Sequence, residues 1–195
     1  MLTPEERRKK ARGANRKGKG FQRKVAKIFS MWFYGGNDSK LKSTPRSGGY
    51  RNKLVGDINN LDNPDEFPLH IECKNVEGGQ SKWDLQDLLR PKSLIEQWWH
   101  QTIDDARISS KIPALVFTRS YEKIYIAITK YTYESVRTFF THDVQTPRHG
   151  IFNIDALASC EHFLDALVVF ELDSFLCWCS PQKLSTHYEE STFYG

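Results

Sequence analysis

The most regular alternation of apolar and polar residues in the chain lies between Leu69 and Lys74. Every second residue there is apolar, and the polar residues between them are His70, Glu72 and Lys74. A period of two is typical of a β-strand with one buried face. The pattern therefore predicts a strand that carries Glu72 and Lys74 side by side on its polar face, with His70 next to them.

Helical spacing of apolar residues recurs on both sides of this strand. Thr3 and Pro4 predict the start of a short helix, which Gly13, Gly18 and Gly20 are expected to interrupt. The apolar spacing predicts a second helix over residues 21–33. Further helices are expected over 81–91 and, from a capping-box pattern, over 93–109, followed by strands at 114–118 and 124–128. This order predicts an α/β core with a mixed sheet.

The last third of the chain has a weaker pattern. Residues 132–140 and 157–164 are expected to be helical, residues 151–154 and 168–172 to be strands, and the remainder to be a polar tail. No motif here carries chemistry, and its histidines are interpreted as surface or core residues. We therefore divide the chain into a basic arm (1–19), a core (20–130) and a C-terminal α/β extension (131–195), which either packs on the core or forms a dimer contact.

Composition fits a soluble globular protein of 195 residues with 39% hydrophobic content. No apolar run approaches the roughly 20 residues that a membrane span requires. Four cysteines without a paired framework favour a reducing compartment, and Cys177 and Cys179 are interpreted as packing residues. These features predict an intracellular protein without a membrane partner.

Charge is distributed unevenly along the chain. Residues 1–30 contain eleven lysines and arginines but two glutamates, whereas the whole chain has a net charge of only +4. A basic arm on a mildly acidic body is typical of proteins that bind a phosphate backbone. The alternative is a solvated basic tail. We favour nucleic acid because the arm leads directly into the strand and helix pattern described above.

Candidate chemistry converges on Asp57 and Glu72. Residues 59–66 between them are rich in turn formers, so the chain can fold back and bring the two carboxylates together. Two carboxylates at a strand end suit a hard divalent cation such as Mg²⁺. Lys74 beside them can hold an attacking water or steady a phosphate, so the group suits metal-assisted phosphodiester hydrolysis.

A second basic segment, residues 43–53, precedes Asp57. Its glycines Gly48 and Gly49 let the backbone approach a ligand closely. The segment is either a DNA-contacting loop or a plain surface loop. Together with the arm it supplies the candidate DNA-binding residues, which are Arg16, Lys17, Lys19, Arg46, Ser47, Arg51 and Lys53.

Asp57 followed by Glu72-Cys73-Lys74 resembles the signature of PD-(D/E)xK nucleases. The wider run from Gly18 to Arg119 is similar to the archaeal- and phage-type Holliday-junction resolvases of that superfamily. The matching pieces, in chain order, are Lys17-Gly18-x-x-Phe21, Pro45-Arg46-Ser47-Gly48-Gly49, Gly56-Asp57, the Glu72–Lys74 strand, Trp98-Trp99-x-Gln101 and Pro113–Phe117. The resemblance implies a restriction-endonuclease-like core with a central mixed β-sheet flanked by helices.

The resemblance also implies roles for particular residues. Asp57, Glu72 and the backbone carbonyl of Cys73 would hold Mg²⁺ or Mn²⁺, and Lys74 would orient or activate the water. Gln22 or Gln101 would position that water or a DNA phosphate. Gln22 stands where the resolvases carry a glutamate, so this position lacks the expected negative charge.

The function implied is a divalent-metal-dependent DNA endonuclease, with a branched DNA junction as the expected substrate. Symmetric cleavage of a junction requires a homodimer. A cytoplasmic protein of phage type fits the resemblance. A restriction- or repair-type nuclease, a DNA-binding module with weakened catalysis and a basic RNA-binding protein remain as alternatives.

Overall fold

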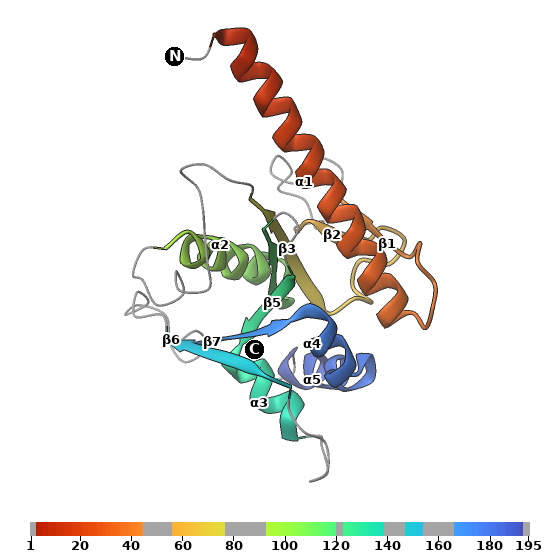
Figure 1. Cartoon of the computed structure of the whole chain (residues 1–195). Helices are drawn as coiled ribbons and strands as arrows, with labels where there is room; N and C mark the ends of the chain where they lie inside the picture. Colours follow the sequence, from red (N-terminus) through yellow and green to blue (C-terminus); the bar gives the residue numbers. More distant parts are fainter. Residues whose placement is uncertain are drawn as a thin grey trace.

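Among the residues that the structure describes, seven strands form one mixed sheet in the order β1-β2-β3-β4-β5-β7-β6 (Figure 1). The computed structural model describes residues 3–44, 56–76, 93–119, 123–138, 147–153 and 166–192. The strands are β1 (Leu41–Ser43), β2 (Ile58–Asn60), β3 (Leu69–Asn75), β4 (Ile112–Thr118), β5 (Ile124–Thr129), β6 (His149–Asn153) and β7 (Ala166–Glu171). The α/β fold with a mixed sheet and flanking helices agrees with the predicted restriction-endonuclease-like class.

The central strand pair, β3 and β4, is parallel, and the other paired strands run antiparallel. Helix α2 (Leu94–Ser109) lies between β3 and β4 in sequence, as a parallel connection requires. Ser93 caps this helix, because its side chain accepts a hydrogen bond from the backbone N–H of Glu96. The strand predicted at 69–74 and the helix predicted at 93–109 are thus confirmed, with ends within one residue.

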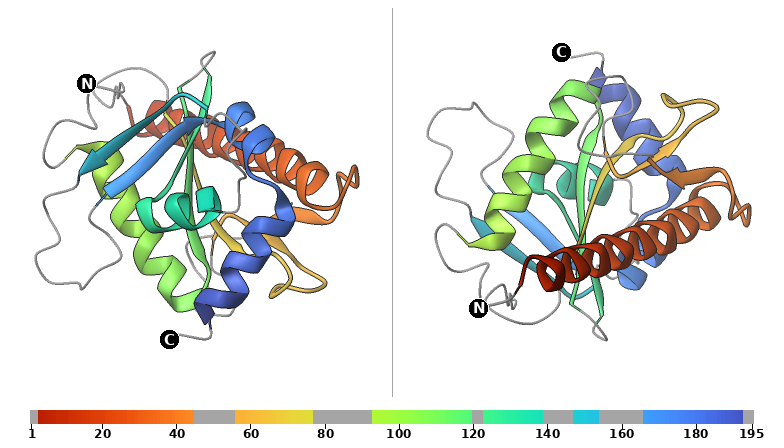
Figure 2. Two further views of the ribbon diagram at one scale, coloured as in Figure 1. Left: turned by 90° about the horizontal axis from the view of Figure 1, so that it is seen from below. Right: turned by 90° about the horizontal axis from the view of Figure 1, so that it is seen from above.

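The two faces of the sheet are covered by different helices, because side chains alternate along each strand. On one face Leu69, Ile71 and Cys73 join a core with residues of α1 (Pro4–Phe33), α3 (Lys130–Thr138), α4 (Leu172–Trp178) and α5 (Pro181–Thr192). On the other face α2 packs on Leu115 and Phe117. In Figure 2, α1 (red) and α2 (light green) are two separate helices next to the strands of the sheet. Helix α2 is therefore the cover for the polar face of β3.

Helix α1 runs without interruption from Pro4 to Phe33, so the predicted break at its glycines is wrong. Thr3 and Glu6 form a full capping box at its start. Each glycine costs only about 1 kcal/mol relative to alanine, and the lysines and arginines around them favour a helix. At 1.5 Å per residue the helix is about 45 Å long, and its first half projects away from the sheet (Figure 1).

Two short strands and two helices were not predicted. Ser43 and residues 59–60 were expected in loops, and no strand was predicted around them, yet β1 and β2 pair antiparallel with register Leu41↔Asn60 and Ser43↔Ile58. The expected polar tail after residue 172 forms α4 and α5, because Phe175 of α4 and Leu184 of α5 are fully buried in the core. The helices predicted at 81–91 and 157–164 lie outside the described residues. None of the described helices is long and apolar enough to cross a membrane.

Candidate active site

The polar face of β3 and the facing side of α2 bring Glu72, Lys74 and Gln101 together. The ammonium of Lys74 lies 2.7 Å from Glu72 Oε1 and donates a hydrogen bond of 2.9 Å to Gln101 Oε1. The amide nitrogen of Gln101 is 3.5 Å from the same Glu72 oxygen. The side chains of Lys74 and Glu72 are only 20% and 10% exposed. The lysine is therefore fixed by two oxygen acceptors.

Asp57 reaches this group from the neighbouring strand. Its backbone N–H donates to the carbonyl of Ile71, and its own carbonyl accepts from the N–H of Thr44, so the residue is held on both sides by β-type pairing. Its carboxylate oxygen Oδ2 accepts a hydrogen bond of 3.0 Å from the backbone N–H of Cys73. Asp57 is 4% exposed. The predicted return of the chain between Asp57 and Glu72 is thus present, and it places the Asp57 carboxylate against the backbone next to Glu72.

Burial and nearby charges both change the pKa of the Glu72 carboxyl. Burial is the main cause that raises the pKa of Glu72 to about 7, and the nearby carboxylate of Asp57 adds to it. The ammonium of Lys74 acts in the opposite direction, and Asp105 contributes a smaller increase. A cation placed between Glu72 and Asp57 would stabilise the ionised form of both carboxylates.

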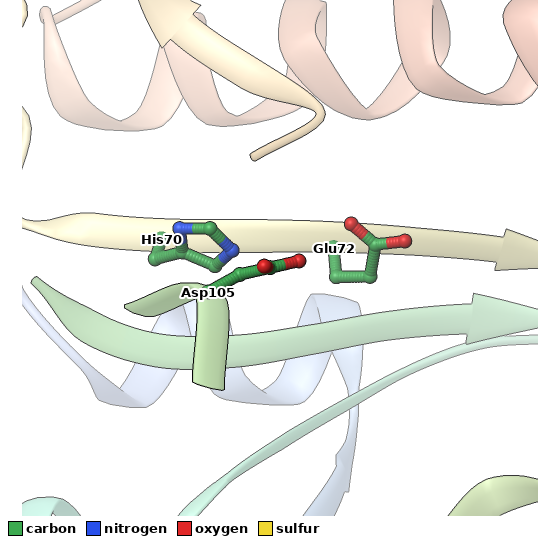
Figure 3. A group of neighbouring side chains, drawn as sticks. All are labelled: His70, Glu72 and Asp105. Carbon is green, nitrogen blue, oxygen red and sulfur yellow. The ribbon is translucent and has the colours of Figure 1, made fainter. Parts of the chain in front are cut away.

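His70 and Asp105 extend the site along β3 and α2, as Figure 3 shows. One ligand atom from each of His70, Glu72 and Asp105 lies within 4.8 Å of the other two. Burial, with Lys111 nearby, lowers the pKa of His70 to about 4, so the ring is neutral at pH 7. The sequence analysis placed His70 on this face but missed Asp105. The spacing of Gln101, Asp105 and Ser109, four residues apart, was the available signal, because such positions share one helix face.

Gln22 lies on α1, one helical turn after Lys19, so the two side chains share a face of that helix. The side-chain oxygen of Gln22 is buried and has no hydrogen-bond partner among the described residues. The ammonium of Lys19 donates 2.9 Å to the carbonyl of Thr44, whose N–H binds Asp57. This face of α1 is thus linked through Thr44 to the strand end that carries Asp57.

The other candidate DNA-binding residues divide into two groups. Arg16 and Lys17 are exposed on the projecting half of α1, together with Arg8, Lys9 and Arg12. Arg46, Ser47, Arg51 and Lys53 lie outside the described residues. The exposed cations give the projecting half of α1 a strongly basic surface, with Glu5 and Glu6 confined to its first turn.

The donor set fits a hard divalent cation. Asp57 and Glu72 are buried and supply carboxylate oxygens, the ligands that such a cation prefers. An ammonium held at 2.7 Å from one of the carboxylates completes a site in which a cation, a water and a phosphate can be gathered. The arrangement is chemically suited to hydrolysis of a phosphodiester.

Comparison with known proteins identifies a family. The family model described as "Phage putative PDDEXK endonuclease" matches residues 13–184. The matched range includes α1 from Gly13 onward, all seven strands and the whole group around Glu72. Searches of curated proteins and of solved structures found no match.

Proposed function

Because the chain belongs to this family of phage PD-(D/E)xK endonucleases, we propose that it hydrolyses DNA phosphodiester bonds at Asp57, Glu72 and Lys74 with the help of a divalent metal ion. The observation that carries the proposal is the contact of Lys74 with Glu72 at 2.7 Å, beside an Asp57 carboxylate bound to the next backbone N–H. This is the acid, acid and lysine set of the family signature, gathered at one place. Family membership supports a nuclease activity on DNA.

Asp57, Glu72 and the carbonyl of Cys73 are the proposed ligands for Mg²⁺ or Mn²⁺. The hydrogen bond from the Cys73 N–H keeps the Asp57 carboxylate against β3. The Asp57 carboxylate is therefore held next to the backbone of Cys73, the residue that follows Glu72. Such an ion, when bound, polarises the scissile phosphate and lowers the pKa of a bound water. The two carboxylates would lose their mutual repulsion on binding it, which the raised pKa of Glu72 supports.

Lys74 is the residue that we propose orients or activates the attacking water. Its side chain is 20% exposed, so it lies within reach of a water or a phosphate oxygen from solvent. Gln101 accepts one of its hydrogen bonds and keeps the ammonium directed toward Glu72. Gln22 would add an uncharged acceptor for a metal-bound water, in place of the acid found in the similar resolvases.

A Holliday junction or another branched DNA is the proposed substrate, and a homodimer the proposed active form. The basic, projecting half of α1 supports this, because it extends about 20 Å or more beyond the first core contacts of the helix and can follow a second DNA arm. Arg16 and Lys17 would contact phosphates there. Two copies related by a two-fold axis would place two active sites on one junction, so that each copy nicks one of two strands.

The experiment compares three labelled DNAs in Mg²⁺: a four-way junction, a linear duplex of the same arm sequence and a supercoiled plasmid. Paired, symmetric nicks in the junction, with the linear duplex uncut, support a resolvase. Equal cutting of the linear duplex indicates a restriction- or repair-type nuclease instead. Tight binding of all three DNAs without cutting in Mg²⁺ or Mn²⁺ would contradict the proposed enzyme and leave a DNA-binding module.

A further inference from the structure

A second group of ligating side chains lies beside the proposed cleavage site. His70 and Glu72 come from the polar face of β3, and Asp105 comes from the facing side of α2. One ligand atom from each lies within 4.8 Å of the others. A cation with bond lengths near 2.1 Å needs ligand atoms within roughly 4.4 Å of one another. A small movement of Asp105, which is only partly buried, would meet that requirement.

The His70 ring provides independent evidence for a ligand. His70 is 1% exposed, and its Nδ1 lies 3.2 Å from the hydroxyl of Ser109. The other ring nitrogen, Nε2, is buried and has no partner among the described residues. Figure 3 shows one nitrogen of this ring facing the Asp105 carboxylate. The Ser109 hydroxyl donates to the carbonyl of Ala106 at 3.1 Å, so it accepts from Nδ1, and the proton of the neutral ring is on Nδ1. Nε2 therefore carries a lone pair, and because a buried polar atom without a partner is costly, this nitrogen calls for an electron-pair acceptor.

A direct interaction between His70 and Asp105 does not fill that role. No hydrogen bond or ion pair joins these two side chains in the part of the chain that the structure describes. The group therefore has a nitrogen donor and two carboxylates that converge on the same space without bonding to each other.

We propose that His70, Glu72 and Asp105 bind a second divalent cation, of the transition-metal class represented by Mn²⁺ and Zn²⁺. An imidazole nitrogen with two carboxylates favours these ions over Mg²⁺, which takes oxygen ligands. Ser109 at Nδ1 fixes the ring with Nε2 toward the ion, as hydrogen-bonded partners of metal-bound histidines do. Glu72 is shared with the proposed cleavage site. The second site goes beyond the proposed function and can be tested without DNA.

The test measures Mn²⁺ binding to the full chain by the EPR signal of the free ion, in the absence of DNA. Asp105→Asn removes one ligand charge, and Asp104→Asn is its matched control, because Asp104 is 73% exposed and pairs with Arg107 instead. We expect the tight Mn²⁺ site to weaken tenfold or more in Asp105→Asn and to persist in Asp104→Asn. Zn²⁺ should compete with Mn²⁺ for this site, and a hundredfold excess of Mg²⁺ should not.

Two further variants separate this site from the cleavage site. His70→Gln should lose the tight Mn²⁺ site, whereas Asp57→Asn should keep it even where cleavage is lost. Equal Mn²⁺ binding by Asp105→Asn and Asp104→Asn would overturn the proposal, whether or not His70→Gln folds. Loss of all Mn²⁺ binding in Asp57→Asn would also overturn it, because it would leave a single site at Asp57 and Glu72. Absence of DNA cleavage by the wild type would refute the proposed function alone.

Discussion

Replacing Glu72 by glutamine should stabilise the metal-free protein while it destroys catalysis. The side chain of Glu72 is 10% exposed, and burial with the Asp57 carboxylate nearby raises its pKa to about 7. In the unfolded chain the same carboxyl has its ordinary pKa near 4.5. Between these two pH values the native state binds more protons than the unfolded state. The stability of the wild type therefore falls as pH rises from about 4.5 to 7 and stays reduced above that range.

The size of this effect follows from the shift. The pKa of Glu72 differs by about 2.5 units between the folded and unfolded states, and each unit corresponds to about 1.4 kcal/mol. The free energy of unfolding of the wild type should therefore be lower by about 3 kcal/mol at pH 8, and by less than about 1 kcal/mol at pH 5. Glu72→Gln keeps the size of the side chain and carries no charge, so it avoids the loss. The variant should thus exceed the wild type by about 3 kcal/mol at pH 8, with the difference nearly gone at pH 5.

The assay is urea unfolding of both proteins in EDTA at pH 5 and pH 8. Adding Mn²⁺ at pH 8 should reverse the order, because the ion stabilises the wild type more than the variant. Gln101→Ala is a useful control, because it removes a neighbour of Glu72 without changing the charge. A Glu72→Gln protein that is less stable than the wild type at pH 8 in EDTA would refute the reasoning about buried charge.

Three further predictions concern the surroundings of the site. Gly56 and Gly36 both have φ of 101°, but only at Gly56 would a Cβ meet the His70 ring, at 3.1 Å. Gly56→Ala should therefore cost at least about 1 kcal/mol more unfolding free energy than Gly36→Ala, and equal losses would contradict this contact. Gln22→Glu should lower the Mg²⁺ concentration for half-maximal cleavage; unchanged metal titrations in both Gln22→Glu and Gln22→Ala would remove Gln22 from the site. Three exposed cations lie on one face of α1, namely Lys9, Arg12 and Arg16. Neutralising all three should reduce the slope of log K against log salt for binding to duplex DNA by up to about 3. An unchanged slope would exclude this face as the DNA contact.

The central strand and the pairing of Glu72 with Lys74 on one of its faces could be predicted because a single alternating pattern encodes both. The period of two in β3 separates the buried Leu69 face from the Glu72 and Lys74 face, and no long-range information is needed to see this. Helix α2 was equally clear, because Ser93 caps it and its apolar stripe is regular. The contact of Gln101 with Lys74 then follows from the cover that α2 provides.

The missed features depend on partners that are distant in the sequence. Strand β2 contains only Ile58, Asn59 and Asn60, and it is a strand because β1 and β3 pair with it. Asp105 comes close to His70 and Glu72 only because α2 packs against β3. Helix α1 continues through its glycines because a capping box begins it and its second half is anchored by buried Val25 and Phe29.

The most direct test of the central claim is cleavage and binding of DNA by wild type and Asp57→Asn, measured on the same four-way junction. Asp57 binds the Cys73 N–H through its carboxylate, and asparagine can keep that hydrogen bond through its side-chain oxygen while it loses the charge. The account predicts that the wild type cuts in Mg²⁺ or Mn²⁺ and stops in EDTA, and that Asp57→Asn binds the junction normally but cuts it at least about a hundredfold more slowly. Cleavage by Asp57→Asn at the wild-type rate, or cleavage by the wild type in EDTA, would contradict a metal-dependent site at Asp57 and Glu72.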